Sequence, residues 1–258
     1  AEADRVGLRI MYDAGMDPYA APAMFERMLA SSRYSSANRM PEFMRTHPLS
    51  EKRIADTRNR ARQYPKRIRP TSLDYQLMRA RVAVSLADTP EEAVAQFKGE
   101  LEGNPRSREA AIYGLVLALT KAGRPEEAAL TLDGIWSDRE QRIEYIMADA
   151  EIALASGQPE LAAKKLQTRL QLSPGNHPLT MAYAHALQQS QQSYLAEEVL
   201  IDQSRIKAND PGLWYLLAEV QGLSGNIIGL HQSRAEYFIL VGNLDAAQRQ
   251  LVYALKLV

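Results

Sequence analysis

The fold is set by a short stretch, Gly123-Arg-Pro-Glu-Glu-Ala-Ala-x-x-Leu132, because the chain repeats it at nearly constant intervals. The next copy is Gly157-Gln-Pro-Glu-Leu-Ala-Ala-x-x-Leu166. Less regular copies begin at Asp88, Gln191 and Gly242. A nearly constant interval of this length indicates supersecondary units that stack on one another into an elongated array.

An interval of roughly 34 residues, as between Gly123 and Gly157, is typical of tetratricopeptide repeats, in which each repeat is a pair of antiparallel helices. A small residue lies where the two helices approach each other, and a large apolar residue follows four positions later. Ala93 with Phe97, and Ala162 with Leu166, fit this spacing. The sequence therefore predicts an all-α fold, a solenoid of helix hairpins with about five and a half repeats.

The predicted helices follow from the repeat register and from the Gly and Pro residues that end helices. They span residues 72–87 with 90–103, 108–122 with 125–137, 141–155 with 158–172, 178–189 with 193–207, and 212–223 with 226–241, and a final helix spans 243–257. The last copy of the motif begins one and a half intervals after the fourth, so helix 226–241 is expected to serve two successive repeats. Leu230 and Arg234 occupy the small and large positions of that helix, which predicts a different packing.

The part of the chain that precedes the repeats is organised differently. Three helices are predicted over residues 3–14, 18–30 and 50–63, with a long loop at 31–47 and a linker at 64–71 that contains two prolines. Gly15 and Asp17 are placed to end the first helix and to begin the second. The predicted domains are therefore 1–63, the end of a separate domain, and 72–258, the solenoid.

Composition and motifs exclude several classes of protein. The chain has no cysteine, which excludes disulfides and thiolate metal sites. No apolar run is long enough to cross a bilayer, so the chain is expected to be peripheral to a membrane at most. No two histidines are three or four residues apart, and no H-E-x-x-H, G-x-S-x-G or P-loop motif occurs. Taken alone, the chain holds no complete catalytic site.

Charge is spread unevenly along the chain. The formal net charge is zero, but the segment 1–70 holds 14 basic and 8 acidic side chains. Nucleic-acid binding through the basic segment 52–69 is one interpretation. Aromatic residues are sparse in that segment, so a solvated helix and linker are favoured, and no nucleic-acid partner is expected.

The first helices of a tetratricopeptide array line its concave inner face. The repeat register places seven side chains there: Tyr113, Met147, Glu151, Met181, His185, Tyr215 and Glu219. Aromatic and methionine side chains beside a few charges suit the binding of an extended protein segment. The alternative is that these side chains pack between adjacent repeats.

The N-terminal residues carry a second signal, a series of short motifs in a fixed order. They are Glu2-Ala-Asp-Arg-x-Gly7, Ala14-Gly-Met-Asp-Pro18, Arg33-Tyr-Ser-Ser36, Thr46-His-Pro-Leu49 and Arg53-Ile-Ala-Asp56. With the repeats that follow, this series resembles the end of the peptidase domain of M48-family zinc metallopeptidases. The resemblance covers the whole chain. Within that family the sequence resembles the periplasmic BepA-type members of Gram-negative bacteria, which carry a C-terminal tetratricopeptide domain.

The resemblance implies a zinc site that this chain holds only in part. Such enzymes bind Zn²⁺ through the two His of H-E-x-x-H and a Glu that here falls one residue before Ala1. These ligands are expected upstream, so the chain alone is expected to bind no zinc stably. Asp4 matches a carboxylate that orients a zinc-bound His. His47 matches a loop His that can reach the zinc, fill the position of the catalytic water and hold the enzyme inactive.

The resemblance also implies a function for the full-length protein, a periplasmic zinc metalloendopeptidase and chaperone whose signal peptide lies upstream or has been removed. Its solenoid is expected to bind misassembled outer-membrane proteins or their assembly machinery. Zinc-activated water is expected to attack the peptide bond, whereas the isolated chain is expected to be inactive. The alternative is a non-enzymatic tetratricopeptide scaffold for complex assembly at the cell envelope, in which residues 3–30 form an extra repeat.

Overall fold

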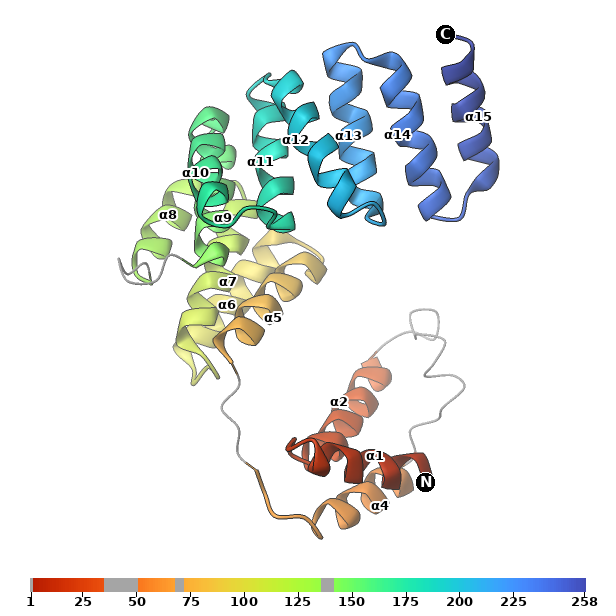
Figure 1. The fold of residues 1–258 in the computed structure, drawn as a ribbon. Coiled ribbons are helices and arrows are strands. Elements are labelled where there is room, and N and C mark those ends of the chain that lie inside the picture. Colours follow the sequence, from red (N-terminus) through yellow and green to blue (C-terminus); the bar gives the residue numbers. More distant parts are fainter. Residues whose placement is uncertain (1, 35–50, 68–71, 136–141) are drawn as a thin grey trace. The chain divides into compact units, whose positions relative to one another are not determined.

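A computed structural model describes residues 2–34, 51–67, 72–135 and 142–258 (Figure 1). Throughout these ranges the regular secondary structure is α-helical, and the chain divides into two compact units, residues 1–72 and 73–258. The predicted all-α fold is therefore confirmed. No helix in the described ranges is both long and apolar enough to cross a membrane.

The described part of the first unit is built from three helices, two of which pack mainly on the third. They are α1 (Glu2–Asp13), α2 (Ala20–Tyr34) and α4 (Glu51–Ala61). Both α1 and α2 contact α4, an arrangement unlike the helix hairpin of a repeat, so it does not support an extra repeat at residues 3–30. Helix α2 extends to residue 34, so the prediction that a loop begins at residue 31 is wrong. Residues 31–34 contain no Gly or Pro that would end the helix earlier.

The turn between α1 and α2 forms as the sequence predicts. Gly15 has a φ of 73°, and the backbone N–H of Met16 donates to the carbonyl of Met11 at 2.8 Å. This pairing satisfies a carbonyl at the helix end, and glycine adopts the required left-handed backbone without a steric penalty. Asp17 then accepts a hydrogen bond from the N–H of Tyr19 at 3.1 Å, just before α2 begins.

The second unit is a row of helices in which each packs against the next (Figure 1). They are α5 (Leu73–Leu86), α6 (Pro90–Glu102), α7 (Arg108–Lys121), α8 (Pro125–Asp133), α9 (Ile143–Ala155), α10 (Pro159–Leu172), α11 (His177–Gln189), α12 (Ser193–Ile206), α13 (Pro211–Ser224), α14 (Ile227–Leu240) and α15 (Leu244–Leu255). The predicted bounds agree to within two residues except at the end of α8, which stops before Gly134. The first helices of successive pairs, α5, α7, α9, α11 and α13, also contact one another, as in stacked tetratricopeptide repeats.

The glycine of the repeated motif closes the turn between the two helices of a pair. Gly123 and Gly157 both have a φ of 70°, and Gly225 has a φ of 80°. In the fourth copy Gln191 takes this position with a φ of 60°. A side chain with a Cβ is strained in this left-handed conformation, so the fourth turn forms despite an unfavourable residue.

Small residues let the helices of the array approach one another closely. The motif residues Ala128 and Ala162 are fully buried. Gly114 on α7 faces the ring of Phe97, and a Cβ built at this glycine would lie 2.3 Å from a ring atom. The buried core runs through the array in two clusters, one from α5 to α9 and one from α9 to α13.

Helix α14 packs against both α13 and α15, and its use by two successive repeats stays a prediction. At its contact with α13, Gly229 and Ser233 are buried, Leu230 is half-buried against Gly222, and Arg234 is exposed. The hydroxyl of Ser233 donates to the side-chain carbonyl of Gln221 at 2.7 Å. The close contact has therefore shifted by one position along the helix, which explains why the motif is not recognisable there.

Candidate functional site

In the first unit an arginine holds the carboxylate that was predicted to orient a zinc-bound histidine. Arg53 on α4 donates from Nε to Asp4 Oδ2 at 2.7 Å and from Nη2 to Asp4 Oδ1 at 2.6 Å. The Asp4 side chain is 7% exposed, and the hydrogen bonds from Arg53 lower the pKa of its carboxyl group. The same guanidinium lies over the ring of Phe25 on α2, 4.7 Å from the ring centroid. This cluster joins all three helices.

These residues do not form a zinc site by themselves. Nowhere in the described ranges is a group of three or more His, Asp or Glu side chains placed to hold a metal ion. His47, the predicted regulatory ligand, lies outside the described residues. The roles of Asp4 beside a zinc-bound histidine and of His47 as a ligand therefore stay predictions.

In the second unit Tyr113 was predicted to line an open surface, and this placement is wrong because its side chain is 0% exposed. Its hydroxyl accepts hydrogen bonds from Nε of Arg81 at 3.1 Å and from Nη2 at 2.8 Å. Nη1 of Arg81 donates to Glu151 Oε1 at 2.8 Å. Burial raises the pKa of Tyr113 to about 12. We call these three residues the polar cluster; it links the first helices α5, α7 and α9.

Further polar contacts join the same three helices. Arg142, just before α9, donates from Nη2 to Asp74 Oδ1 on α5 at 2.7 Å. Tyr145 on α9 donates to the Glu109 carboxylate near the start of α7. Arg81 and Glu151 of the polar cluster also border a hollow of ≈ 320 Å³. At this end of the array, several polar side chains of the first helices are thus engaged with one another.

The remaining predicted residues differ in exposure. Met147 and Met181 are half-buried and pack against the second core cluster, so they serve partly as packing between repeats. His185 is exposed, and its Nε2 lies 3.4 Å from the amide nitrogen of Gln189. The residues that were predicted to line one inner face therefore differ in exposure: some are buried, some half-buried and some exposed.

An exposed tyrosine on α13 and a half-buried tyrosine on α14 lie beside each other. Tyr215 is 52% exposed, and its ring lies 5.5 Å from that of Tyr237 on α14 in an edge-to-face arrangement. The carboxylate of Glu219 accepts a hydrogen bond from the Tyr215 phenol and raises the pKa of this tyrosine. We call Tyr215, Glu219 and Tyr237 the aromatic patch. Aromatic side chains with a polar tip are enriched in protein interfaces.

Sequence reasoning missed two members of these groups. Arg81 contacts residues 32 and 70 positions away, so no local spacing points to it. The signal available was a basic residue within the apolar first helix of a repeat. Tyr237 was missed because only the first helices were expected to line the inner face, and α14 was treated mainly as a second helix.

Comparison with known proteins gives two family matches. The model for peptidase family M48 matches residues 1–61, and the model for the tetratricopeptide repeat matches residues 153–220. The chain is 32% identical over 247 residues to the beta-barrel assembly-enhancing protease of Escherichia coli (strain K12). It is 29% identical over 247 residues to the protein of that name from Yersinia pestis.

Each of these matches covers 95% of this chain and 50% of the relative. The chain thus spans about half the length of the curated relatives it matches. The M48 match falls on the unit that contains the Asp4–Arg53 pair, and the repeat match falls on α9 to α13. The resemblance inferred from the sequence is therefore confirmed, and one chain combines a match to peptidase family M48 with a match to the tetratricopeptide repeat.

Proposed function

We propose that this chain is part of a periplasmic zinc metalloendopeptidase and chaperone whose tetratricopeptide array binds misassembled outer-membrane proteins or their assembly machinery. The observation that carries the proposal is the joining of M48 and tetratricopeptide sequence in one chain that is similar, over 95% of its length, to beta-barrel assembly-enhancing proteases. Proteolysis and binding are thereby assigned to separate units. The scaffold interpretation accounts for the repeats but not for the M48 match.

The catalytic residues are assigned to sequence outside these 258 residues. The chain contains no H-E-x-x-H, and the described residues offer no set of metal ligands. Asp4 is held in a fixed orientation by Arg53, which suits a carboxylate that orients a ligand histidine. The chain alone is expected to be proteolytically inactive and to bind no zinc stably.

His47 is assigned a regulatory role in the full-length protein. A catalytic zinc keeps one position open for water, and an imidazole in that position prevents water from binding. His47→Ala in the full-length protein is expected to raise the rate of proteolysis and to leave unfolding unchanged. Equal rates for the variant and the parent protein would remove this assignment.

The aromatic patch is assigned to partner binding, with His185 as a neighbouring contact on α11. The patch offers the exposed ring of Tyr215, the half-buried ring of Tyr237 and the carboxylate of Glu219, whereas the groups of the polar cluster bind one another. Extended segments of unfolded β-barrel proteins carry alternating apolar and polar side chains, and such segments suit a surface of this composition.

The test begins with the sequence upstream of Ala1 in the full-length protein. We expect a Glu directly before Ala1 and an H-E-x-x-H motif further upstream. With zinc, the full-length protein should cleave an unfolded outer-membrane β-barrel protein, and a Glu→Gln change in H-E-x-x-H should abolish cleavage. The chain described here should bind the same protein without cleaving it. An upstream region without H-E-x-x-H would contradict the proposal and favour the scaffold.

A further inference from the structure

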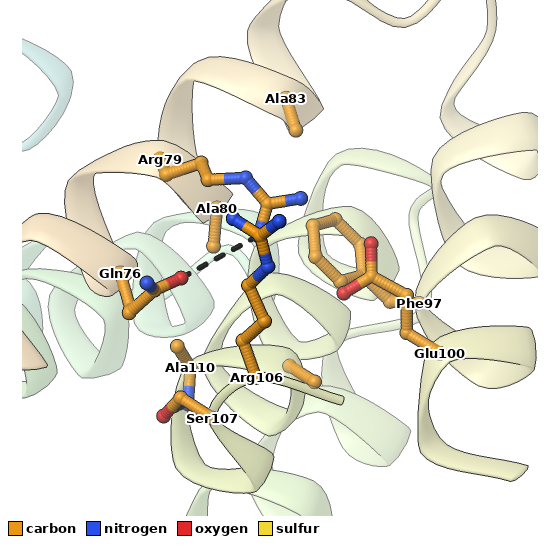
Figure 2. Close-up of a pocket in the computed structure, with 10 residues that line it drawn as sticks. Gln76, Arg79, Ala80, Ala83, Phe97, Glu100, Arg106, Ser107 and Ala110 are labelled. Carbon is orange, nitrogen blue, oxygen red and sulfur yellow. Dashed lines mark hydrogen bonds between the residues drawn. The ribbon is translucent and has the colours of Figure 1, made fainter. Parts of the chain in front are cut away.

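A narrow pocket opens between α5, α6 and the start of α7 (Figure 2). It is lined by Gln76, Arg79, Ala80, Ala83, Phe97, Glu100, Arg106, Ser107, Ala110 and Ala111. Alanines form much of the lining, and the ring of Phe97 closes one side. The water-accessible volume is ≈ 20 Å³, which accommodates one small polar group. A nucleotide base or an aromatic side chain is too large for this space.

Gln76 lines the pocket with a donor that has no partner. Its side chain is nearly fully buried, at 3% exposure, and its Nε2 makes no hydrogen bond. The orientation of the amide is set by Arg79, whose Nη1 donates to Gln76 Oε1 at 3.4 Å. A flipped amide would place two donors against each other. A buried donor without a partner is destabilising, so a ligand that supplies an acceptor oxygen is favoured here.

Two arginines add positive charge to the same pocket. Arg79 extends from α5 and Arg106 from the turn before α7, and both guanidinium groups reach into the pocket (Figure 2). In the described part of the chain, neither forms an ion pair with a carboxylate. Glu100 is the acidic residue that lines the pocket, and its Oε1 accepts from the amide nitrogen of Gln96 at 3.2 Å.

The charges and hydrogen-bonding groups of the pocket define the ligand. Two guanidinium groups and one carboxylate leave a net charge of about +1, which a monoanion neutralises and a dianion exceeds. Ser107 caps α7 by accepting from the N–H of Ala110 at 3.2 Å, so its hydroxyl proton is a further donor. The positive end of the α7 dipole lies at the same place.

We propose that this pocket binds a single carboxylate group, such as the side chain of an acidic residue or the chain terminus of a bound protein segment. Planar guanidinium groups bind a carboxylate through paired hydrogen bonds, and the Gln76 Nε2 adds a buried donor. The site lies in the first repeat, away from α13 and α14, and its occupation does not depend on peptidase activity.

The test is a titration of the ¹⁵N-labelled chain with sodium acetate at constant ionic strength, followed by the side-chain amide signal of Gln76 in NMR spectra. The signal is assigned by its loss in Gln76→Leu. We expect a saturable shift with acetate, at least tenfold weaker binding in Arg106→Gln, and stronger binding in Glu100→Gln because a competing negative charge is removed. Arg124→Gln is the matched control, since Arg124 is paired with Glu127 elsewhere on the array.

Three results would overturn the proposal. One is a Gln76 signal that does not respond to acetate or responds equally to sodium chloride. Another is the same acetate affinity in Arg106→Gln as in the parent chain. The third is tighter binding of inorganic phosphate than of acetate, which would assign the pocket to a dianion. A saturable response to acetate that is weakened only by the pocket variants supports the carboxylate site.

Discussion

The two ends of the array use their first helices in opposite ways. From α5 to α9, the guanidinium of Arg81 donates hydrogen bonds to the buried hydroxyl of Tyr113 and to the carboxylate of Glu151. On α13 and α14, Tyr215 and Tyr237 meet each other, and Tyr215 leaves much of its surface exposed. The same helical scaffold therefore carries an internally bonded face at one end and an unoccupied aromatic face at the other. We therefore expect the polar cluster to contribute mainly to stability and, under the proposed function, the aromatic patch to contribute to partner binding.

The largest expected effect comes from breaking the polar cluster. Arg81→Met removes both donors from the buried Tyr113 hydroxyl and leaves Glu151 unpaired, which should lower the free energy of unfolding by about 2 kcal/mol. Arg205→Met is the matched control, because Arg205 forms an exposed ion pair with Asp202 that contributes less than about 0.5 kcal/mol. Urea unfolding measures both. Equal effects would show that the polar cluster is no more important than a surface pair.

The next prediction concerns pH. Burial raises the pKa of Tyr113 to about 12, whereas tyrosines in the unfolded chain titrate near pH 10. Between these values the folded chain retains a proton that the unfolded chain has lost, so stability falls as pH rises, by up to about 1.4 kcal/mol per pH unit. The variant Tyr113→Phe has no phenol at this position and therefore lacks this contribution to the pH dependence of stability. The stability difference between parent and variant should therefore shrink by about 1 kcal/mol from pH 9 to pH 11.

The exposed tyrosine provides the control for this pH dependence. Tyr215 is 52% exposed, so solvent screens its interaction with Glu219 and Tyr215→Phe should change the pH dependence less than Tyr113→Phe does. Parallel stability curves for the parent chain and Tyr113→Phe would contradict the account of a buried phenol. A larger pH effect from Tyr215→Phe would reverse the comparison between the two ends.

The smallest expected effect concerns the turn between the two helices of a repeat, in the copy that joins α11 to α12. Gln191 adopts a φ of 60° where other copies have glycine. Gln191→Gly should raise the free energy of unfolding by about 0.5–1 kcal/mol, because the relief of left-handed strain exceeds the entropy cost of glycine. The reverse change, Gly157→Gln, should lower it. Thermal unfolding distinguishes these outcomes, and a loss of stability in Gln191→Gly would show that its side chain makes a stabilising contact.

The sequence predicted the scaffold well because its signals are local. A Pro at the first turn, a small residue four positions before a large one and a Gly at the turn recur in several copies of the motif, and they predict helix bounds to within two residues for almost every helix of the array. Leu230 and Arg234 at the small and large positions predicted a different packing in one repeat, and there Gly229 and Ser233 are the buried residues. A shift by one position is a matter of packing between helices, which the sequence pattern does not encode.

The candidate site was less predictable, because face and exposure depend on distant residues. Tyr113 and Tyr215 are both aromatic residues on first helices, yet one is fully buried and the other 52% exposed. The difference comes from Arg81 and the packing of α5 against α7, and neither is visible in the motif spacing. The roles of Asp4 and His47 were taken from a family resemblance, and the arginine that holds Asp4 was found only in the structure.

The account is tested most directly by the affinity of the chain for an unfolded outer-membrane β-barrel protein. We predict that Tyr215→Ala combined with Tyr237→Ala weakens binding at least tenfold while changing the free energy of unfolding little. Tyr194→Ala, which removes a tyrosine on α12 that is 77% exposed, should leave affinity unchanged. Unchanged binding in the double variant, or an equal loss in Tyr194→Ala, would contradict the assignment of partner binding to the aromatic patch.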